Sequence, residues 1–222
     1  MKVGLCGRLK PKEGFLARTI GLEKLDGYSH VIRWVGGLDV VLETKKELEE
    51  FLSKYGSYVY TVGEEEMEEV VGRLLKKRGL KVATAESCTG GLLSARIVNV
   101  PGSSTYFVGG FVVYANELKT KLLSVEEEVI RNQGAVSEEV CRQMAVGALE
   151  ETDADIALAI TGISGPGGGS QEKPVGLTFI ALATDREVVL RSFLFGADRN
   201  ENRFLATQWA LEMLRQHLIK EE

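Results

Sequence analysis

Residues 84–91 carry the sequence Thr-Ala-Glu-Ser-Cys-Thr-Gly-Gly. A short apolar strand over Leu80–Thr84 precedes this stretch, and a helix over about Gly90–Val98 is expected to follow it. The stretch therefore places Ser87 and Cys88 on a strand-to-helix turn, where a nucleophile is exposed and the N–H groups of the helix start can stabilise an anion. A strand, a glycine turn and a helix are also ordinary α/β architecture, so the function depends on the rest of the chain.

Strands and helices alternate on both sides of this turn. Further strands are predicted at Tyr106–Tyr114, Ile156–Ile160, Val175–Ala183 and Val188–Phe195. Further helices are predicted at 64–78, from Glu117, at 125–132, at 137–151 (capped by Ser137) and at 200–219. This alternation predicts an α/β fold for residues 63–222, a three-layer α/β/α sandwich with a mixed, mostly parallel sheet. The last two strands resemble a hairpin, so at least one antiparallel pair is expected.

Residues 1–62 differ from the rest and are predicted to form a separate small α+β domain. The apolar runs His30–Trp34 and Leu38–Leu42 are separated by two glycines, as in a hairpin. Thr44 is expected to cap an amphipathic helix, and Tyr58–Tyr60 to form a short strand. The acidic run at 64–66 is interpreted as the first turn of the next helix, complementing its dipole.

Composition limits the class of protein. The chain has 222 residues, 44% of them hydrophobic, and a net charge of −5. This is enough for one full core and a small second one, and the charge argues against nucleic-acid or membrane-surface binding. The three cysteines, Cys6, Cys88 and Cys141, lack metal-ligand or disulfide spacing, and the N-terminus has no long apolar run. A cytoplasmic protein without metal or cofactor is therefore expected.

Histidine is nearly absent, which restricts the chemistry available to a nucleophile. His30 lies in the small N-terminal unit and His217 near the end of the last helix. Neither is a plausible partner for Ser87 or Cys88, so a Ser-His-Asp or Cys-His triad is improbable. Another group, a lysine or a tyrosine, would have to accept the proton of the nucleophile.

Tyr114 and Lys119 supply both of these groups. Tyr114 ends an apolar strand, so its hydroxyl is expected at the sheet edge where sites form. Lys119 follows about one helical turn into the next element, and as a base it would have to be desolvated to be partly neutral. The alternative is a plain surface lysine, equivalent to Lys121.

A glycine-rich loop follows the strand Ile156–Ile160. Its residues 161–170, Thr-Gly-Ile-Ser-Gly-Pro-Gly-Gly-Gly-Ser, contain more glycines than a simple turn needs. Free N–H groups in such a loop can hold a phosphate or a carbonyl oxygen. The loop is neither a P-loop nor a dinucleotide fingerprint. Lys173 and Arg199 could add charge for a phosphate, or could be ordinary solvent-exposed charges.

Together and in this order, these motifs resemble the CinA C-terminal domain family, the nicotinamide-nucleotide amidohydrolases. The matching stretches lie within residues 64–217 and are Thr84–Gly91, Pro101–Ser104, Tyr114–Glu117, Gly134–Ser137, Thr161–Pro166 and Glu172–Gly176. The resemblance implies hydrolysis, without a metal, of the carboxamide of nicotinamide mononucleotide to nicotinic acid mononucleotide and ammonia, a step of pyridine nucleotide recycling. The small-molecule substrate is then the expected partner, and a homo-oligomer is expected.

The resemblance also implies roles for individual residues. Ser87, rather than Cys88, is the nucleophile, and Lys119 and Tyr114 handle its proton. Further active-site or substrate-binding positions implied are Ser104, Thr161, Gly165, Gly167, Gly168, Lys173 and Arg199. Ala115 stands where serine is common in the family.

The resemblance also bears on the first sixty residues, and two other functions stay open. Full-length CinA proteins carry a large N-terminal domain that resembles molybdopterin-binding enzymes and has pyrophosphatase activity; we expect no counterpart of it here. Residues 39–62 instead resemble the small linker domain of such proteins. The alternatives are a catalytically silent binding or scaffolding module, and an amidase for a different small amide. Intact Ser87, Tyr114 and Lys119 argue against the silent module.

Overall fold

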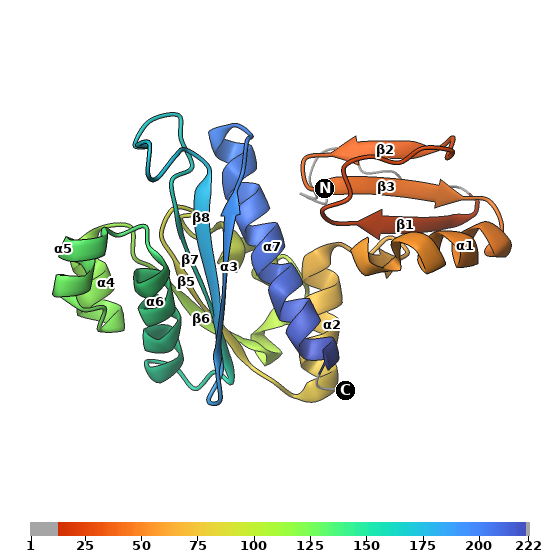
Figure 1. Ribbon diagram of the computed structural model, residues 1–222. Coiled ribbons are helices and arrows are strands. Elements are labelled where there is room, and N and C mark those ends of the chain that lie inside the picture. The colour runs from red at the N-terminus through yellow and green to blue at the C-terminus, as the bar shows by residue number, and fades with distance from the viewer. Residues whose placement is uncertain (1–12, 221–222) are drawn as a thin grey trace. The chain divides into compact units, whose positions relative to one another are not determined.

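The computed structural model describes residues 13–220, so Cys6 and the N-terminal segment interpreted above lie outside the described residues. The chain divides into two compact units, Met1–Val70 and Val71–Glu222. The division falls inside helix α2 (Met67–Arg78), which is drawn in yellow in Figure 1. We keep the domain boundary after residue 62 as a proposal, because it follows the last strand of the first unit and leaves α2 whole.

The first unit contains a four-stranded antiparallel sheet of order β2-β3-β1-β4. The strands are β1 (Phe15–Thr19), β2 (Val31–Trp34), β3 (Gly37–Leu42) and β4 (Val59–Val62). The β2–β3 hairpin and the cap at Thr44 of α1 (Lys45–Tyr55) are confirmed, since the hydroxyl of Thr44 accepts the N–H of Glu47. Strand β1 is not predicted from the sequence, because it has only five residues and its partner strands β3 and β4 lie far away along the chain.

The second unit is built on a five-stranded mixed sheet of order β6-β5-β7-β8-β9. Its strands are β5 (Val82–Glu86), β6 (Phe107–Val112), β7 (Ile156–Gly162), β8 (Leu177–Ala183) and β9 (Val188–Leu194). β5 pairs in parallel with β6 and β7, whereas β8 runs antiparallel to β7 and β9. The mixed sheet and the hairpin of its last two strands are confirmed, with two parallel and two antiparallel pairings.

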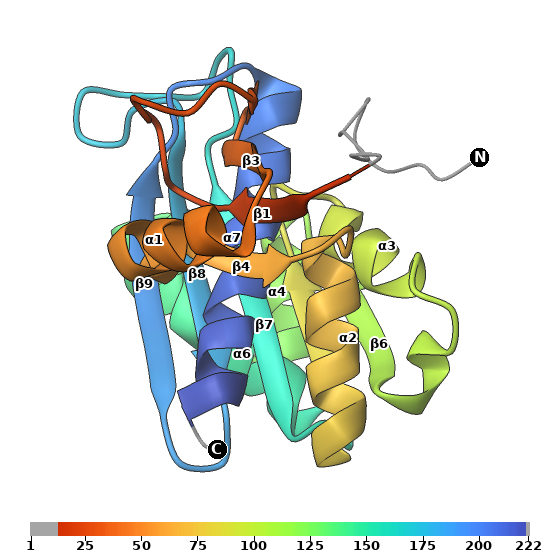
Figure 2. The same ribbon diagram turned by 90° about the vertical axis from the view of Figure 1, so that its right-hand side faces the viewer.

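Helices cover both faces of this sheet and complete the expected three layers (Figure 1). On one face lie α3 (Leu92–Val98) and the long α7 (Arg199–Lys220), which Figure 2 shows running along the strands and which contacts β7 and β8. On the other face lies α6 (Glu138–Glu150), with α4 (Asn116–Leu123) and α5 (Glu127–Gln133) packed against it. Ser137 caps α6 as expected, because its hydroxyl accepts the N–H of Val140.

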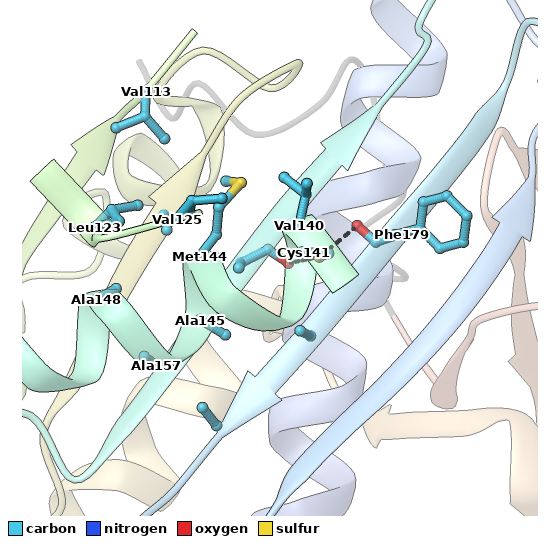
Figure 3. Packing of buried hydrophobic residues seen from close by; sticks show 14 residues of the cluster. Val113, Leu123, Val125, Val140, Cys141, Met144, Ala145, Ala148, Ala157 and Phe179 are labelled. Atoms are coloured by element: carbon cyan, nitrogen blue, oxygen red, sulfur yellow. Dashed lines mark hydrogen bonds between the residues drawn. The ribbon is translucent and has the colours of Figure 1, made fainter. Parts of the chain in front are cut away.

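The main core lies between α6 and the sheet (Figure 3). Small side chains on the strands let the helix approach closely; they include Ala157, Ala159, Ala181 and Ala183. α6 fills the space with Val140, Cys141 and Met144, and burial of Val140 and of Met144 contributes about 2 kcal/mol each. The Cys141 thiol also donates to the carbonyl of Phe179 at 3.3 Å. Cys141 is thus a packing residue.

The acidic run at 64–66 precedes helix α2 instead of forming its first turn. The carbonyl of Glu66 accepts the N–H groups of Glu69 and Val70, so Glu66 stands at the cap position, and Glu68 and Glu69 are the first-turn acids. The carboxylate of Glu66 pairs with the buried guanidinium of Arg18. The run therefore contributes an ion pair within the first unit as well as a helix start.

Candidate active site

The carboxyl ends of the three parallel strands β6, β5 and β7 meet at one edge of the sheet. Ser87 is the first residue after β5, the middle strand of the three. Its N–H donates to the carbonyl of Ile160 in β7 at 3.0 Å. On the other side, the N–H of Val113, which follows β6, donates to the carbonyl of Glu86 at 2.9 Å. The turn that starts at Ser87 is therefore tied to both neighbouring strands.

The turn itself is tight and depends on its glycines. The N–H of Gly90 donates to the carbonyl of Ser87 at 3.1 Å, and the backbones of Gly90 and Gly91 have φ of +60° and +92°. A side chain is disfavoured in this left-handed region, which explains the glycine pair. Ser87 is 9% exposed, so only a small part of the side chain is open to solvent.

The start of helix α3 is already occupied by a carboxylate, which corrects the expectation of free N–H groups there. The buried side chain of Glu86 accepts the N–H of Leu93 at 2.9 Å and the N–H of Ser94 at 2.8 Å. It also accepts the hydroxyl of Ser94 at 2.6 Å. These N–H groups belong to the first turn of α3, where a negative charge is favourable. An oxyanion would have to bind elsewhere.

The N–H groups of Cys88 and Thr89 are the remaining candidates for an oxyanion site. Neither donates to another residue within the described part of the chain, and both directly follow Ser87. The hydroxyl of Thr89 is also buried without a hydrogen-bond partner among residues 13–220. Two adjacent N–H groups that donate to no other described residue, beside a candidate nucleophile, are the donors that an oxyanion hole requires.

Cys88 lies beside Ser87 but has the properties of a structural thiol. Burial raises the pKa of the Cys88 thiol to about 11. At neutral pH the side chain is therefore a protonated thiol, whereas reactive cysteines are thiolates with lowered pKa. This favours Ser87 as the nucleophile of the pair.

Lys119 is buried beside the same turn. Its side chain is 1% exposed, and its Nζ donates to the carbonyls of Val113 at 2.8 Å and Tyr114 at 3.2 Å. Burial lowers the pKa of Lys119, and the neighbouring Cys88 and Glu117 side chains oppose this shift. A desolvated lysine with a lowered pKa is the form that a lysine base requires. Lys121, two residues on, is exposed.

Tyr114 is placed near Lys119 by its backbone and not by its hydroxyl. Lys119 contacts the carbonyl oxygen of Tyr114, while the tyrosine side chain is 63% exposed. In this conformation Lys119 is buried and Tyr114 is exposed, and a proton-handling role for Tyr114 stays a proposal.

The glycine-rich loop follows β7 at the same sheet edge. Thr161 is fully buried and its hydroxyl donates to the carbonyl of Ala135 at 2.9 Å, which links the loop to the segment before α6. Gly165 and Gly168 have φ of +87° and +86°. A side chain at Gly167 would meet no atom within 4 Å, so the loop backbone is open to a ligand there.

The two expected phosphate-binding cations have protein partners. The ammonium of Lys173 donates to the carbonyls of Gln133 and Val136, so it braces the segment between α5 and α6. The guanidinium of Arg199, at the start of α7, donates to the carbonyl of Gly165. Arg199 is exposed, so the rest of its guanidinium can face a ligand of the loop.

Ser104 is not brought to this site. It belongs to the short helix η2 (Ser103–Thr105), which precedes the amino end of β6. β6 runs parallel to β5, so this end lies at the opposite edge of the sheet from Ser87, about 15 Å away along a five-residue strand. The sequence match could not show this, because it gives no strand direction.

His217 cannot serve Ser87, as expected. Arg203 of α7 contacts the turn, since its guanidinium donates to the carbonyl of Thr89. His217 lies fourteen residues further along the same helix, or about 21 Å at the rise of an α-helix. His30 belongs to the first unit.

Two negative findings concern the described residues only. Within residues 13–220, no group of three or more His, Cys, Asp or Glu side chains could hold a metal ion. Over the same range, no helix has the length and apolar character needed to cross a membrane.

Comparison with known proteins identifies the family. The family model of the CinA C-terminal domain matches residues 64–218, which include the whole of the site. The chain belongs to the CinA C-terminal domain family. A CinA-like protein from Chloroherpeton thalassium is 49% identical over 170 residues, which cover 75% of this chain and 40% of that protein. A CinA-like protein from Thermotoga neapolitana is 49% identical over 171 residues, covering 77% and 42%. The chain thus spans about two fifths of the length of these relatives.

Solved structures of CinA proteins have the same fold. The competence/damage inducible protein of Agrobacterium tumefaciens superposes with a TM-score of 0.66 at 42% identity, covering 70% of this chain and 96% of that one. The competence damage-inducible protein A of Klebsiella pneumoniae gives 0.68 at 30% identity, covering 71% and 100%. The α/β/α architecture of the second unit is therefore that of the CinA C-terminal domain.

Glu86, Asn202 and Arg203 are not predicted as site residues from the sequence. For Glu86, an acidic residue between a buried strand and a helix start is the signal that could have indicated a cap. Asn202 and Arg203 carry no local signal, because their contacts reach loops far away in the sequence.

Proposed function

We propose that this protein is an amidase that hydrolyses the carboxamide of nicotinamide mononucleotide to nicotinic acid mononucleotide and ammonia. The observation that carries the proposal is a buried lysine that two hydrogen bonds link to the residue before a serine on a strand-to-helix turn. Lys119 donates to the carbonyl of Val113, whose own N–H is bonded to Glu86, the residue before Ser87. The resemblance of the site motifs to the nicotinamide-nucleotide amidohydrolases supports the substrate.

The chemistry follows from the serine-lysine pair. Neutral Lys119 accepts the proton of the Ser87 hydroxyl, directly or through Tyr114, while the Ser87 oxygen bonds to the carboxamide carbon. The lowered pKa of Lys119 favours this neutral form. The tetrahedral intermediate then loses ammonia, which takes the proton from Lys119. Water cleaves the resulting ester by the reverse proton path and regenerates Ser87.

Backbone N–H groups stabilise the charge on the carbonyl oxygen. The N–H groups of Cys88 and Thr89 directly follow the nucleophile, and each donor in such a site contributes about 3–4 kcal/mol to the transition state. Since Glu86 occupies the first turn of α3, the turn and not the helix supplies these donors.

The glycine-rich loop and Arg199 hold the ribose phosphate in this proposal. Gly165, Gly167 and Gly168 present backbone, and Arg199 joins the loop through the carbonyl of Gly165. Lys173 contributes by fixing the neighbouring segment, because its ammonium is bonded to two carbonyls there.

A single assay tests the proposal. The purified protein is incubated with nicotinamide mononucleotide, nicotinamide riboside, nicotinamide and unrelated small amides, with and without chelator, and ammonia release is measured. We expect release from the mononucleotide, insensitive to chelator and absent in Ser87→Ala. Release from another amide alone would indicate an amidase of different specificity. No release from any amide by the folded protein would favour a binding or scaffolding module and contradict the proposal.

A further inference from the structure

The first turns of α7 contact both loops that form the candidate site. The guanidinium of Arg203 donates to the carbonyl of Thr89, two residues after Ser87, at 2.8 Å. One residue earlier, the amide of Asn202 donates to the carbonyl of Ser164 in the glycine-rich loop at 3.1 Å. The two loops are thus connected through adjacent residues of one helix.

The serine turn needs an external support of this kind. Gly90 and Gly91 both lie in the left-handed region, and glycine has the largest loss of backbone freedom on ordering. The carbonyl of Thr89 lies directly before this pair and accepts the N–H of Leu92 at 3.3 Å, as well as the bond from Arg203. Arg203 therefore holds the turn directly before Gly90 and Gly91, where the backbone of the turn has the most conformational freedom.

The helix end that supplies this support is itself rigid. The side chain of Asn202 is buried. Its amide oxygen accepts the N–H of Ala197, and its amide nitrogen donates to the carbonyl of the same residue. The carboxylate of Asp198 accepts the N–H groups of Asn200 and Glu201, which caps the helix. A half-buried guanidinium on such an end has little freedom to move.

We propose that Arg203 is a positioning residue that fixes the Ser87 turn, with the N–H groups of Cys88 and Thr89, relative to the glycine-rich loop. The proposal rests on the proposed function for its catalytic consequence. The turn carries the groups used in the transition state, whereas the glycine-rich loop carries those proposed to bind the substrate in the ground state. Loss of the Arg203 bond should therefore lower kcat more than it raises KM.

Steady-state kinetics of Arg203 variants test the catalytic part. In Arg203→Met we expect kcat to fall about 10- to 100-fold, the effect of a displacement of about 1 Å, with KM changed less than about threefold. Arg203→Lys can still donate to the Thr89 carbonyl and should recover most of the loss. Arg142→Met, at an exposed pair with Glu139 on α6, is the matched control and should behave as wild type. An Arg203→Met enzyme with kcat within twofold of wild type would overturn the proposal.

Amide hydrogen exchange tests the positioning part without any substrate. Exchange at Gly90 and Leu92, whose N–H groups are bonded inside the turn, should be faster in Arg203→Met, while exchange in β5 and β7 stays unchanged. Equal exchange in the turn overturns the proposal even if wild type is an active amidase. Conversely, an inactive wild type contradicts only the proposed function, and the exchange result then decides on Arg203. If Arg203→Met does not fold, Arg203→Gln takes its place with the same criteria.

Discussion

The ammonium of Lys119, in helix α4, donates to the carbonyl of Val113, which directly follows strand β6, at 2.8 Å. Val113 in turn donates its N–H to Glu86, so a short chain of hydrogen bonds links Lys119 to the residue before Ser87. These hydrogen bonds connect a buried lysine to the turn that carries Ser87.

Replacement of Ser87 and of Cys88, one at a time, tests which of the two is the nucleophile. Ser87→Ala should remove ammonia release while the protein stays folded, because no other hydroxyl occupies that turn position. Cys88→Ala should stay active, because the Cys88 thiol, with a pKa of about 11, is protonated at neutral pH. Ammonia release and thermal unfolding of both variants are measured, and an inactive Cys88→Ala beside an active Ser87→Ala would reverse the assignment.

Removal of the candidate base should affect turnover more than binding. Lys119→Met should lower kcat about a thousandfold with little change in KM, as for loss of a general base. Lys121→Met, at an exposed position on the same helix, is the control and should keep wild-type rates. Near-normal turnover of Lys119→Met would contradict the proposed role.

The pH dependence of the wild-type rate should reflect the same lysine. Only the neutral amine accepts a proton, so kcat/KM should rise with pH as Lys119 loses its proton. Because burial lowers the pKa of Lys119, the midpoint should lie below the ordinary lysine value of about 10.4. The profile of kcat/KM against pH is measured on wild type and on Lys121→Met. If kcat/KM does not rise as the pH approaches the pKa of Lys119, a lysine base is contradicted.

Substitution of Glu86 should loosen the start of α3. Glu86→Gln keeps one acceptor oxygen but places an amide N–H₂ against the N–H donors of Leu93 or Ser94. We expect the free energy of unfolding to fall by about 1–3 kcal/mol, together with a loss of kcat. Urea denaturation and kinetics are compared with Glu138→Gln, an exposed residue of α6. Unchanged stability would mean that the carboxylate does not hold the helix.

Close packing of α6 against α4 predicts a further effect on stability. A Cβ added at Gly147 would lie 2.1 Å from the carbonyl oxygen of Leu123 at the end of α4. Gly147→Ala should therefore destabilise the protein by about 1–3 kcal/mol and, by shifting α4, lower the rate. Gly196→Ala meets no atom within 4 Å and is the control, expected within about 0.5 kcal/mol of wild type.

Removal of residues 1–62, which hold the four strands of the first unit, should leave the amidase chemistry intact. Every residue proposed for the site belongs to the second unit, and a chain beginning at Gly63 keeps α2 whole. We expect it to fold and to release ammonia, with a change confined to its association state, measured by light scattering. A folded but inactive shortened chain would mean that the first unit completes the site.

The sequence by itself determined the local elements of this protein and the turn that carries Ser87, the candidate nucleophile. The alternating strands and helices, the β8–β9 hairpin, the caps at Thr44 and Ser137 and the glycine pair after Ser87 all depend on residues a few positions apart. Local hydrogen bonds, side-chain periodicity and backbone sterics decide such features, and they are visible in short stretches of sequence.

Only the tertiary structure decided which of these residues meet. The parallel direction of β5 and β6 brings Lys119 to the Ser87 turn and sends Ser104 to the opposite sheet edge. The Glu86 carboxylate takes the helix start, and Arg203 reaches Thr89 across 114 residues of sequence. Such contacts follow from strand order and helix packing, which arise from burial of surface between distant segments and leave no periodic trace in the sequence.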